Sequence, residues 1–306
     1  MLSIKNNLGG LSEGLYVWKK YECVACLSFI GNEDFTLKTS NTTKNWDGIL
    51  EYSTDMKTWS IWDGTKISSS ANKLYLRGIG NTKITGYATN EYRNFVFTGT
   101  DSLKISCEGN IETLLDYETV IVGEHPIMGD YCYFNMFRGC TSLIKTPTLP
   151  ATRLISGCYY SMFAYCTSLT TAPELPATTL IAYCYTSMFE GCTSLTTIPK
   201  LPSTLLFKGC YKDMFRGCTS LTTIPELLAI TLADDCYSYM FFNCTNIKLS
   251  ITQTDEYRIP YRIPTSGAGI IAPNALAGMF TKTGGTFVGT PEINTTYYLS
   301  TSNTIV

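Results

Sequence analysis

The sequence is poor in charge and in histidine. Charged residues make up only 16% of its 306 residues, the formal net charge is −2, and His125 is the single histidine. Because no basic or acidic block occurs, we do not expect electrostatic binding to nucleic acid or to an anionic membrane. A zinc site usually needs four converging side chains, which one histidine does little to supply. We therefore predict that the protein binds no metal, no cofactor and no nucleic acid.

Long apolar runs are lacking as well. The longest run near the start is VACLSFI (residues 24–30), which is far too short to span a bilayer. The N-terminal stretch MLSIKNNLGGLSEGLYVWKKYE has no apolar core of the kind found in secretory signals. These features predict a protein that is neither exported through a signal peptide nor inserted into a membrane.

Motifs of enzymes are not found either. The chain has no P-loop, no dinucleotide-binding fingerprint and no recognisable catalytic triad, so we do not expect an enzyme. Cys23 and Cys26 form a CxxC pair, but it lies in a strand-like stretch and not at the start of a helix, where a redox pair would be placed. His125 has no evident partner and is predicted to be a surface or turn residue. Asp234 and Asp235 could bind calcium, but a capping role before a helix explains them more simply.

Cysteine, in contrast, is abundant and periodic. Of the 13 cysteines, ten belong to the motif C-Y-x-x-M-F-x-x-C, which starts at Cys132 and recurs every 26 residues. A constant period predicts one structural unit stacked on copies of itself. The ten repeat cysteines are Cys132, Cys140, Cys158, Cys166, Cys184, Cys192, Cys210, Cys218, Cys236 and Cys244.

Within each unit, the apolar residues occupy positions one, two, five, six and nine, counted from the first cysteine. These spacings predict a short helix with one apolar side. Glycine or asparagine at position eight is typical of a residue that ends a helix in the left-handed conformation, and Tyr165 departs from this rule. Leu195 and Ile198 then predict a short strand, and Pro199 and Pro202 a stiff return.

The regular placement of the cysteines predicts two buried ladders. A cysteine at the same place in every unit behaves as a small apolar residue stacked on its own copies. Because no export signal is recognised, we expect these residues to be thiols. Disulfides between adjacent units and a metal site are the alternatives, and whether any of these cysteines pair stays open.

The repeats resemble BspA-like leucine-rich repeats in a 26-residue form. The resemblance rests on the motif MFxxCTSLTxxPxLPATxL and covers residues 130–249; four of five units keep CTSL, and the fifth has CTNI from Cys244. It implies a leucine-rich-repeat solenoid with a short helix and a short strand in each coil. Relatives of this kind are bacterial surface adhesins or are encoded by phages of gut bacteria, so the resemblance implies binding and not catalysis.

Together, these features predict an α+β fold in which a small β-sandwich precedes a leucine-rich-repeat solenoid. Alternating stretches such as KLYLRG and NFVFTG predict the sandwich, and ALAGMF predicts a degenerate sixth coil. The expected parts are an N-terminal attachment segment (1–31), a sandwich-like domain (32–108), an N-terminal cap (109–131), five repeats (132–249), and an insertion loop with the sixth coil and a C-terminal cap (250–306).

Three functions fit these features. The first is a phage virion protein, an adhesin or receptor-binding protein associated with the tail or a fibre and assembled in the host cytoplasm. The second is a bacterial cell-surface adhesin, and the third is a structural decoration or spacer protein of a virion. The expected partners are a glycan or protein of the host cell surface, other virion proteins through the N-terminal region and, in a homo-oligomer, further copies of the chain.

The candidate binding surface is the part of each unit that varies. Positions three, four and seven change in charge, size and aromaticity between units, and we expect them to face solvent. Exposed aromatic side chains on a rigid scaffold suit contacts with sugars or proteins. An alternative is that these positions vary because nothing contacts them. The candidate residues are Tyr160, Tyr165, Tyr183, Glu190, Lys212, Arg216, Tyr239 and Phe242.

Overall fold

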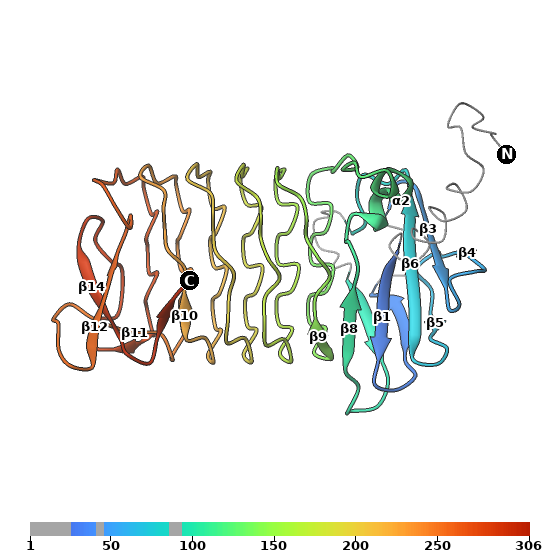
Figure 1. The fold of residues 1–306 in the computed structure, drawn as a ribbon, viewed down its shortest axis with the longest axis horizontal. Helices are drawn as coiled ribbons and strands as arrows, with labels where there is room; N and C mark the ends of the chain where they lie inside the picture. The colour runs from blue at the N-terminus through green and yellow to red at the C-terminus, as the bar shows by residue number, and fades with distance from the viewer. Residues whose placement is uncertain (1–25, 41–45, 86–93) are drawn as a thin grey trace, which may run out of the picture.

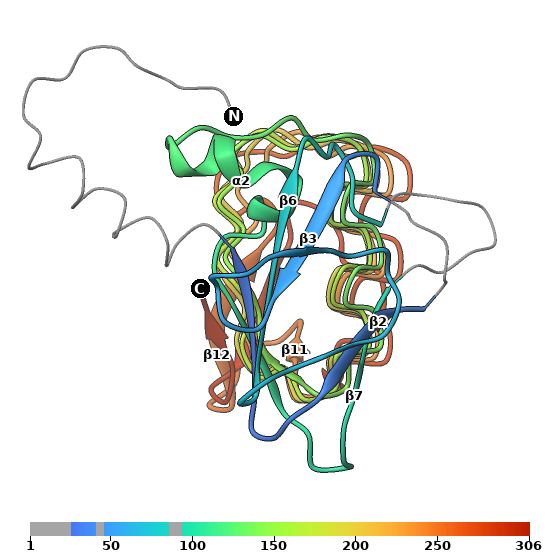
Figure 2. The same ribbon diagram turned by 90° about the vertical axis from the view of Figure 1, so that its right-hand side faces the viewer.

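The computed structural model describes residues 26–40, 46–85 and 94–306. The molecule is elongated, with a β-region at the N-terminal end, a stack of repeated segments in the middle and a second β-region at the far end (Figure 1). Seen along the long axis, successive repeats lie nearly one behind another (Figure 2).

The β-region at the N-terminal end has two sheets. The larger has the strand order β4-β3-β6-β1-β8-β9, and the smaller has the order β5-β2-β7. β1 pairs antiparallel with β6 and β8, whereas β8 pairs parallel with β9, which belongs to the first repeat. The bounds are β1 (Leu27–Gly31), β2 (Thr36–Thr39), β3 (Ile49–Ser53), β4 (Ser60–Ile61), β5 (Ile67–Ser68), β6 (Lys73–Ile79), β7 (Phe95–Thr98), β8 (Ile105–Glu108) and β9 (Leu143–Lys145). Because β1 lies inside the larger sheet, this region begins before residue 32, where the sequence placed its boundary.

Aromatic side chains join this region to the stack. Phe29, Trp62 and Phe95 are at most 1% exposed. The Trp46 and Trp62 rings stack with their centroids 5.4 Å apart, and Phe95 meets Phe137 of the first repeat edge to face at 5.7 Å. The core of the β-region therefore continues into the repeats without a break.

The helix α2 (Thr113–Ile121) packs against β6 at this junction. The amide Nδ2 of Asn81 donates to the backbone oxygen atoms of Ile49 at 2.7 Å and Leu114 at 3.1 Å. Gly78 lies in β6 against the same Leu114 carbonyl, and a Cβ at residue 78 would overlap that carbonyl. The close approach of helix and strand therefore requires glycine at this position.

We expect Gly78→Ala to lower the free energy of unfolding by at least about 2 kcal/mol, because the added methyl group meets backbone and not a movable side chain. Urea unfolding measures this change. Gly80→Ala is the matched control, since a Cβ there meets no atom within 4 Å and carries only the strain of a φ of 60°, about 1 kcal/mol. Equal losses in the two variants would contradict the close approach of α2 to β6.

The repeats are not helical, so the predicted α+β fold with a helix in each coil of a leucine-rich-repeat solenoid is wrong. Within the described residues α2 is the only helix, and residues 132–249 contain turns and three short strands, of which β9 is the first, followed by β10 (Thr223–Ile224) and β11 (Lys248–Ser250). The residue before the first cysteine and the residues at positions four and eight have φ between 50° and 74° in all five repeats. An α-helix cannot contain a left-handed residue at every fourth position.

The error has a simple cause. Apolar residues at positions one, two, five, six and nine recur every four residues, which is close to the 3.6-residue period of a helix but equally suits consecutive four-residue turns. Tyr165, which looked like an exception at position eight, has a φ of 61° and takes the same left-handed conformation as the three glycines and Asn243 of the other repeats. The sequence pattern therefore predicted which side of the segment is buried, and it did not predict the backbone conformation.

Backbone hydrogen bonds in these turns alternate between two partners. The N–H of Phe134 donates within the repeat to the carbonyl of Tyr131 (3.1 Å), whereas the N–H of Tyr133 donates to the carbonyl of Cys158 in the next repeat (3.0 Å). The same bond joins Tyr159 to Cys184, Tyr185 to Cys210 and Tyr211 to Cys236, each at 3.0 Å. Each repeat thus uses some backbone N–H groups for bonds within itself and others for bonds to the next repeat. An isolated repeat would leave the second set without acceptors in the chain.

Side chains stack in the same direction. Tyrosines at position two and phenylalanines at position six form two files of parallel rings with centroids 5.5–5.9 Å apart. The tyrosine file is Tyr133, Tyr159, Tyr185, Tyr211 and Tyr237, and the phenylalanine file is Phe137, Phe163, Phe189, Phe215, Phe241 and Phe280. All of these rings are buried. Repeated burial of large rings makes a large apolar contribution to the stability of the stack.

The C-terminal region covers the last repeat. The N–H of Tyr237 donates to the carbonyl of Ala275 at 2.9 Å, and Phe241 stacks on Phe280 at 5.8 Å, so residues 275–280 add a further layer. A sheet of order β12-β14-β11-β13 follows, and β15 pairs parallel with β10. The bounds are β12 (Tyr257–Arg262), β13 (Gly284–Gly285), β14 (Thr296–Ser300) and β15 (Thr304–Ile305). Asn303, 1% exposed, donates to the carbonyls of Thr222 and Asn246 and holds the chain end against the stack.

Candidate binding surface

The turn segments present an outer face, which we define as positions three, four, seven and eight of the five repeats together with the equivalent residues of the sixth layer. The expectation that all third, fourth and seventh positions face solvent is wrong. The buried residues at these positions, at most 7% exposed, are Asn135, Ser161, Ala164, Ser187, Thr186 and Ser238. Their small side chains fit beneath the adjoining turns, and the amides of Asn135, Ser161 and Ser187 donate to the next repeat.

Positions seven and eight carry a continuous file of side chains along the stack. The Arg138 guanidinium lies 4.7 Å from the centre of the Tyr165 ring, and the Tyr165 hydroxyl donates to Glu190 Oε1 at 3.0 Å. Glu190 Oε1 lies 4.0 Å from Arg216 Nε. Because each contact links neighbouring repeats, this file ties the outer face together along its length.

The file continues toward the C-terminal region. The Arg216 guanidinium lies 4.6 Å from the centre of the Phe242 ring, and Lys282 Nζ lies 5.3 Å from the same ring. Contacts of this kind at exposed sites contribute about 0.5–1 kcal/mol each. We call the six residues the outer file: Arg138, Tyr165, Glu190, Arg216, Phe242 and Lys282.

Burial raises the pKa of two side chains at this file, Asp213 beside it and Tyr165 within it. Asp213 accepts a hydrogen bond from Arg216 Nη1 at 3.2 Å. Burial raises the pKa of Asp213, and the arginine opposes that rise. Burial also raises the pKa of the Tyr165 phenol, and the hydrogen bond to Glu190 adds to the increase. Tyr165 is therefore a neutral hydrogen-bond donor at physiological pH.

Several tyrosines on or beside this face lie directly on a glycine of the following repeat. Tyr165 covers Gly191 and Tyr183 covers Gly209, and a Cβ on either glycine would overlap the ring. The remaining pairs of this kind are Tyr131 with Gly157 and Tyr239 with Gly278. Each tyrosine and each glycine has a positive φ. These rings therefore help to hold successive repeats in register, and what they expose to solvent is one side of the ring.

The eight predicted binding residues fall into separate groups. Tyr165, Glu190, Arg216 and Phe242 belong to the outer file, and Tyr239 meets Phe242 edge to face at 5.9 Å. The other three, which lie apart from this file, are Tyr160, whose ring is 5.3 Å from Phe134, Tyr183, which covers Gly209, and Lys212, whose Nζ is 3.8 Å from Asp235 Oδ1.

Two members of the outer file are not among the eight candidate residues, although the first lies at a position predicted to vary. Arg138 occupies position seven of the first repeat, and Lys282 occupies position eight of the sixth layer when that layer is numbered from Ala275. The signal that could have found both is the repeat register itself, because a position that is varied and charged in one repeat lies next to the same position in its neighbours.

The ten repeat cysteines are buried and free. At position nine the thiol of each repeat donates to the position-six carbonyl of the preceding repeat; Cys192, for example, donates to Phe163 at 3.1 Å. Cys140 makes the same bond to Phe95 of the β-region at 3.1 Å. Burial raises the pKa of both ladders, to about 12 for Cys192 and Cys244. These cysteines are therefore small donors in the core and poor nucleophiles.

The remaining candidate residues are placed as follows. His125 does have a partner, contrary to prediction, because its Nδ1 lies 2.8 Å from Glu112 Oε2 and the Glu112 side chain is 2% exposed. The capping role predicted for Asp234 and Asp235 is wrong, since no helix begins after them. Cys26 is buried, and Cys23 lies outside the described residues. Across the described ranges, no group of three or more His, Cys, Asp or Glu side chains is placed to share a metal ion.

Comparison with known proteins yields no match: no protein-family model, no curated protein and no solved structure is similar to this chain. The resemblance to BspA-like repeats therefore remains a prediction from the sequence motif. None of the helical structure in the described part of the chain is long and apolar enough to cross a membrane.

Proposed function

We propose that the protein is a binding protein of a phage virion, associated with the tail or a fibre, and that it presents the outer face to a glycan or protein on the host cell. In this proposal the N-terminal region attaches the protein to other virion proteins. The sequence resemblance supports the phage origin, and the arrangement of the repeats supports the binding role.

The observation that carries the proposal is the contrast between the two sides of the turn segments. The buried side repeats Cys, Tyr, Met, Phe and Cys in all five units, whereas the outer file places six residues of four different chemical kinds in one line. A constant interior under a varied, partly aromatic exterior is the arrangement expected where recognition evolves on a rigid scaffold.

A spacer or decoration protein is the second candidate, and a specific observation favours it. The charges of the outer file contact one another or an aromatic ring, and the tyrosines lie on glycines of the next repeat. A face that satisfies its own polar groups could serve only to stiffen an elongated particle component.

Binding of the purified full-length protein to a panel of gut bacteria separates these candidates. The double variant Arg216→Ala with Phe242→Ala removes the centre of the outer file and is expected to weaken cell binding by at least about tenfold. Flow cytometry with fluorescently labelled protein gives the apparent dissociation constant, and thermal unfolding reports whether the variant is folded.

The matched control is Lys200→Ala with Glu226→Ala, which removes two exposed charges of repeats three and four from the strand side of the stack, the side that carries β9 and β10. This variant should bind as the unchanged protein does. Undiminished binding by the outer-file variant would exclude this face as the adhesive surface. If the unchanged protein binds no strain of the panel, the spacer candidate is the better account.

A further inference from the structure

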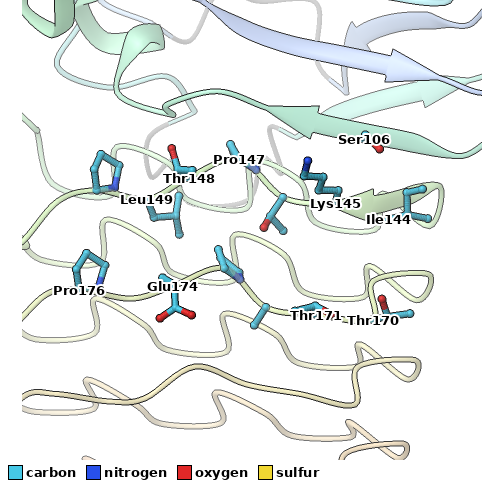
Figure 3. Close-up of a pocket in the computed structure, with 14 residues that line it drawn as sticks. Ser106, Ile144, Lys145, Pro147, Thr148, Leu149, Thr170, Thr171, Glu174 and Pro176 are labelled. Carbon is cyan, nitrogen blue, oxygen red and sulfur yellow. The ribbon is translucent and has the colours of Figure 1, made fainter. Parts of the chain in front are cut away.

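An open groove of about 630 Å³ lies between the first and second repeats, on the strand side of the stack. Residues 144–150 of the first repeat form one wall and residues 170–176 of the second form the other, with Ser106 of β8 at one end. Figure 3 shows the two chain segments running alongside each other, with Leu149 between them. This volume is within the range of pockets that bind small ligands.

The groove exists because two side chains are small. The third and fourth repeats carry Ile198 and Ile224 at equivalent positions, and these side chains are 6% and 0% exposed. The same position holds Thr146 in the first repeat and Ala172 in the second, and both are only half-buried. The missing side-chain volume is not filled by a neighbour, so the cavity is a property of these two repeats.

Backbone hydrogen bonding between the repeats is also interrupted at this groove. No backbone hydrogen bond joins residues 144–149 to residues 170–175, both of which are fully described. The first repeat instead bonds to the β-region through Thr148, whose N–H donates to Gly109 O at 2.9 Å. The second bonds to the third, where the N–H of Thr196 donates to Thr170 O at 3.0 Å. The two walls therefore bond to other segments and not to each other, and no backbone ladder closes the space between them.

Hydroxyl groups and C–H surfaces alternate around the groove. Thr146, Thr170 and Thr171 supply hydroxyls that can donate or accept a hydrogen bond. The Thr148 hydroxyl donates to Gly109 O at 3.1 Å and can still accept one. Flat and branched C–H surfaces come from Pro147, Pro150, Pro173, Pro176, Ile144 and Leu149. A pyranose ring alternates hydroxyl groups and C–H patches in the same way.

The charges point to a ligand without net charge. Lys145 Nζ is already paired with Glu108 Oε1 at 2.7 Å, so it does not supply an uncompensated positive charge for an anion. Glu174 is exposed on the second repeat and lines the groove, where a carboxylate repels anions and accepts hydrogen bonds from hydroxyl groups.

We propose that this groove binds a neutral oligosaccharide. The proposal goes beyond the binding function proposed above, because it adds a second site, on the strand side of the stack and not on the outer face. An extended peptide is disfavoured, because Pro147 and Pro173 remove backbone N–H groups from the two walls and a continuous strand ladder could not form.

The test uses the purified full-length protein on an array of neutral oligosaccharides, followed by calorimetric titration of the best binder. Ala172→Ile places in the second repeat the side chain found at Ile198, and it should weaken binding by at least about tenfold by filling the groove. Because it fills space, it should leave the melting temperature unchanged or raise it, so loss of binding cannot be ascribed to unfolding.

A matched pair of threonines tests the hydrogen bonds. Thr170→Val removes a hydroxyl that lines the groove and should weaken binding by roughly three- to tenfold. Thr222→Val makes the same change at the same repeat position two repeats further on, away from the groove, and should have no effect.

Absence of binding to every sugar on the array would overturn the proposal, as would unchanged affinity in Ala172→Ile. If the protein binds peptides and no sugar, and Ala172→Ile loses that binding, the groove is a peptide site and the oligosaccharide proposal is overturned. The variant with Arg216→Ala and Phe242→Ala should keep its affinity for the sugar. If the protein binds sugar but adheres to no cell, the proposed adhesin function is overturned and the sugar site in the groove is supported. If it adheres to cells but binds no sugar, the sugar site is overturned and the adhesin function is supported.

Discussion

We expect the protein to unfold at alkaline pH, near pH 10, although it is folded at pH 7. Burial raises the pKa of all ten repeat cysteines above the ordinary thiol value, to about 12 for Cys192 and Cys244. Below the ordinary value, folded and unfolded chains both keep these protons, and the thiols do not affect stability. Between the ordinary value and the raised one, the unfolded chain releases protons that the folded chain keeps, so rising pH favours unfolding.

The expected effect is large because the thiols act together. At pH 10 each lowers the free energy of unfolding by about 1–2 kcal/mol, so ten of them lower it by about 10–20 kcal/mol. That is comparable with the total stability of a typical domain, about 5–15 kcal/mol. Burial also raises the pKa of the five stacked tyrosines, which adds to the effect with the same sign.

Circular dichroism between pH 7 and pH 11 measures the transition, and alkylation with iodoacetamide provides the control. At pH 8 the repeat thiols of the native protein should remain unmodified, whereas the same thiols in guanidinium chloride should react completely. Rapid alkylation of the native protein at pH 8, or an intact spectrum at pH 11, would show that the two ladders are not buried as described.

A second large effect is expected for Met188→Asp. Met188 is fully buried, and its carbonyl accepts the N–H of Phe163 at 3.0 Å. An unpaired carboxylate at this place costs about 3–5 kcal/mol, or takes up a proton to avoid that cost. Because each repeat shares its backbone hydrogen bonds with its neighbours, the loss should spread to the adjoining repeats.

Hydrogen exchange distinguishes a spreading loss from a local one. In Met188→Asp, amides of the repeats before and after residues 184–209 should lose protection as well as those within this range. Thr193→Asp, which puts the same carboxylate on an exposed position of the same repeat, should exchange like the unchanged protein. Loss confined to residues 184–209 would contradict the sharing of hydrogen bonds between repeats.

The candidate surface was partly predictable from the sequence. The repeat register placed Tyr165, Glu190, Arg216 and Phe242 at varied positions outside the core, and these residues lie in one file in the structure. Their partners could not be predicted, because a contact between Arg216 and Phe242 depends on how far each repeat is displaced from the last. The groove was not predicted either, although Ala172 stands where Ile198 stands one repeat later.

The sequence by itself determined the 26-residue period and which side of each turn segment is buried, because equivalent residues of stacked copies must lie together. It did not determine the backbone of the segment, since a four-residue spacing of apolar residues suits a helix and a series of turns almost equally. Tertiary structure decided between them. Left-handed residues at every fourth position free alternate amides to bond to the next repeat, and only the neighbouring repeat can accept those bonds.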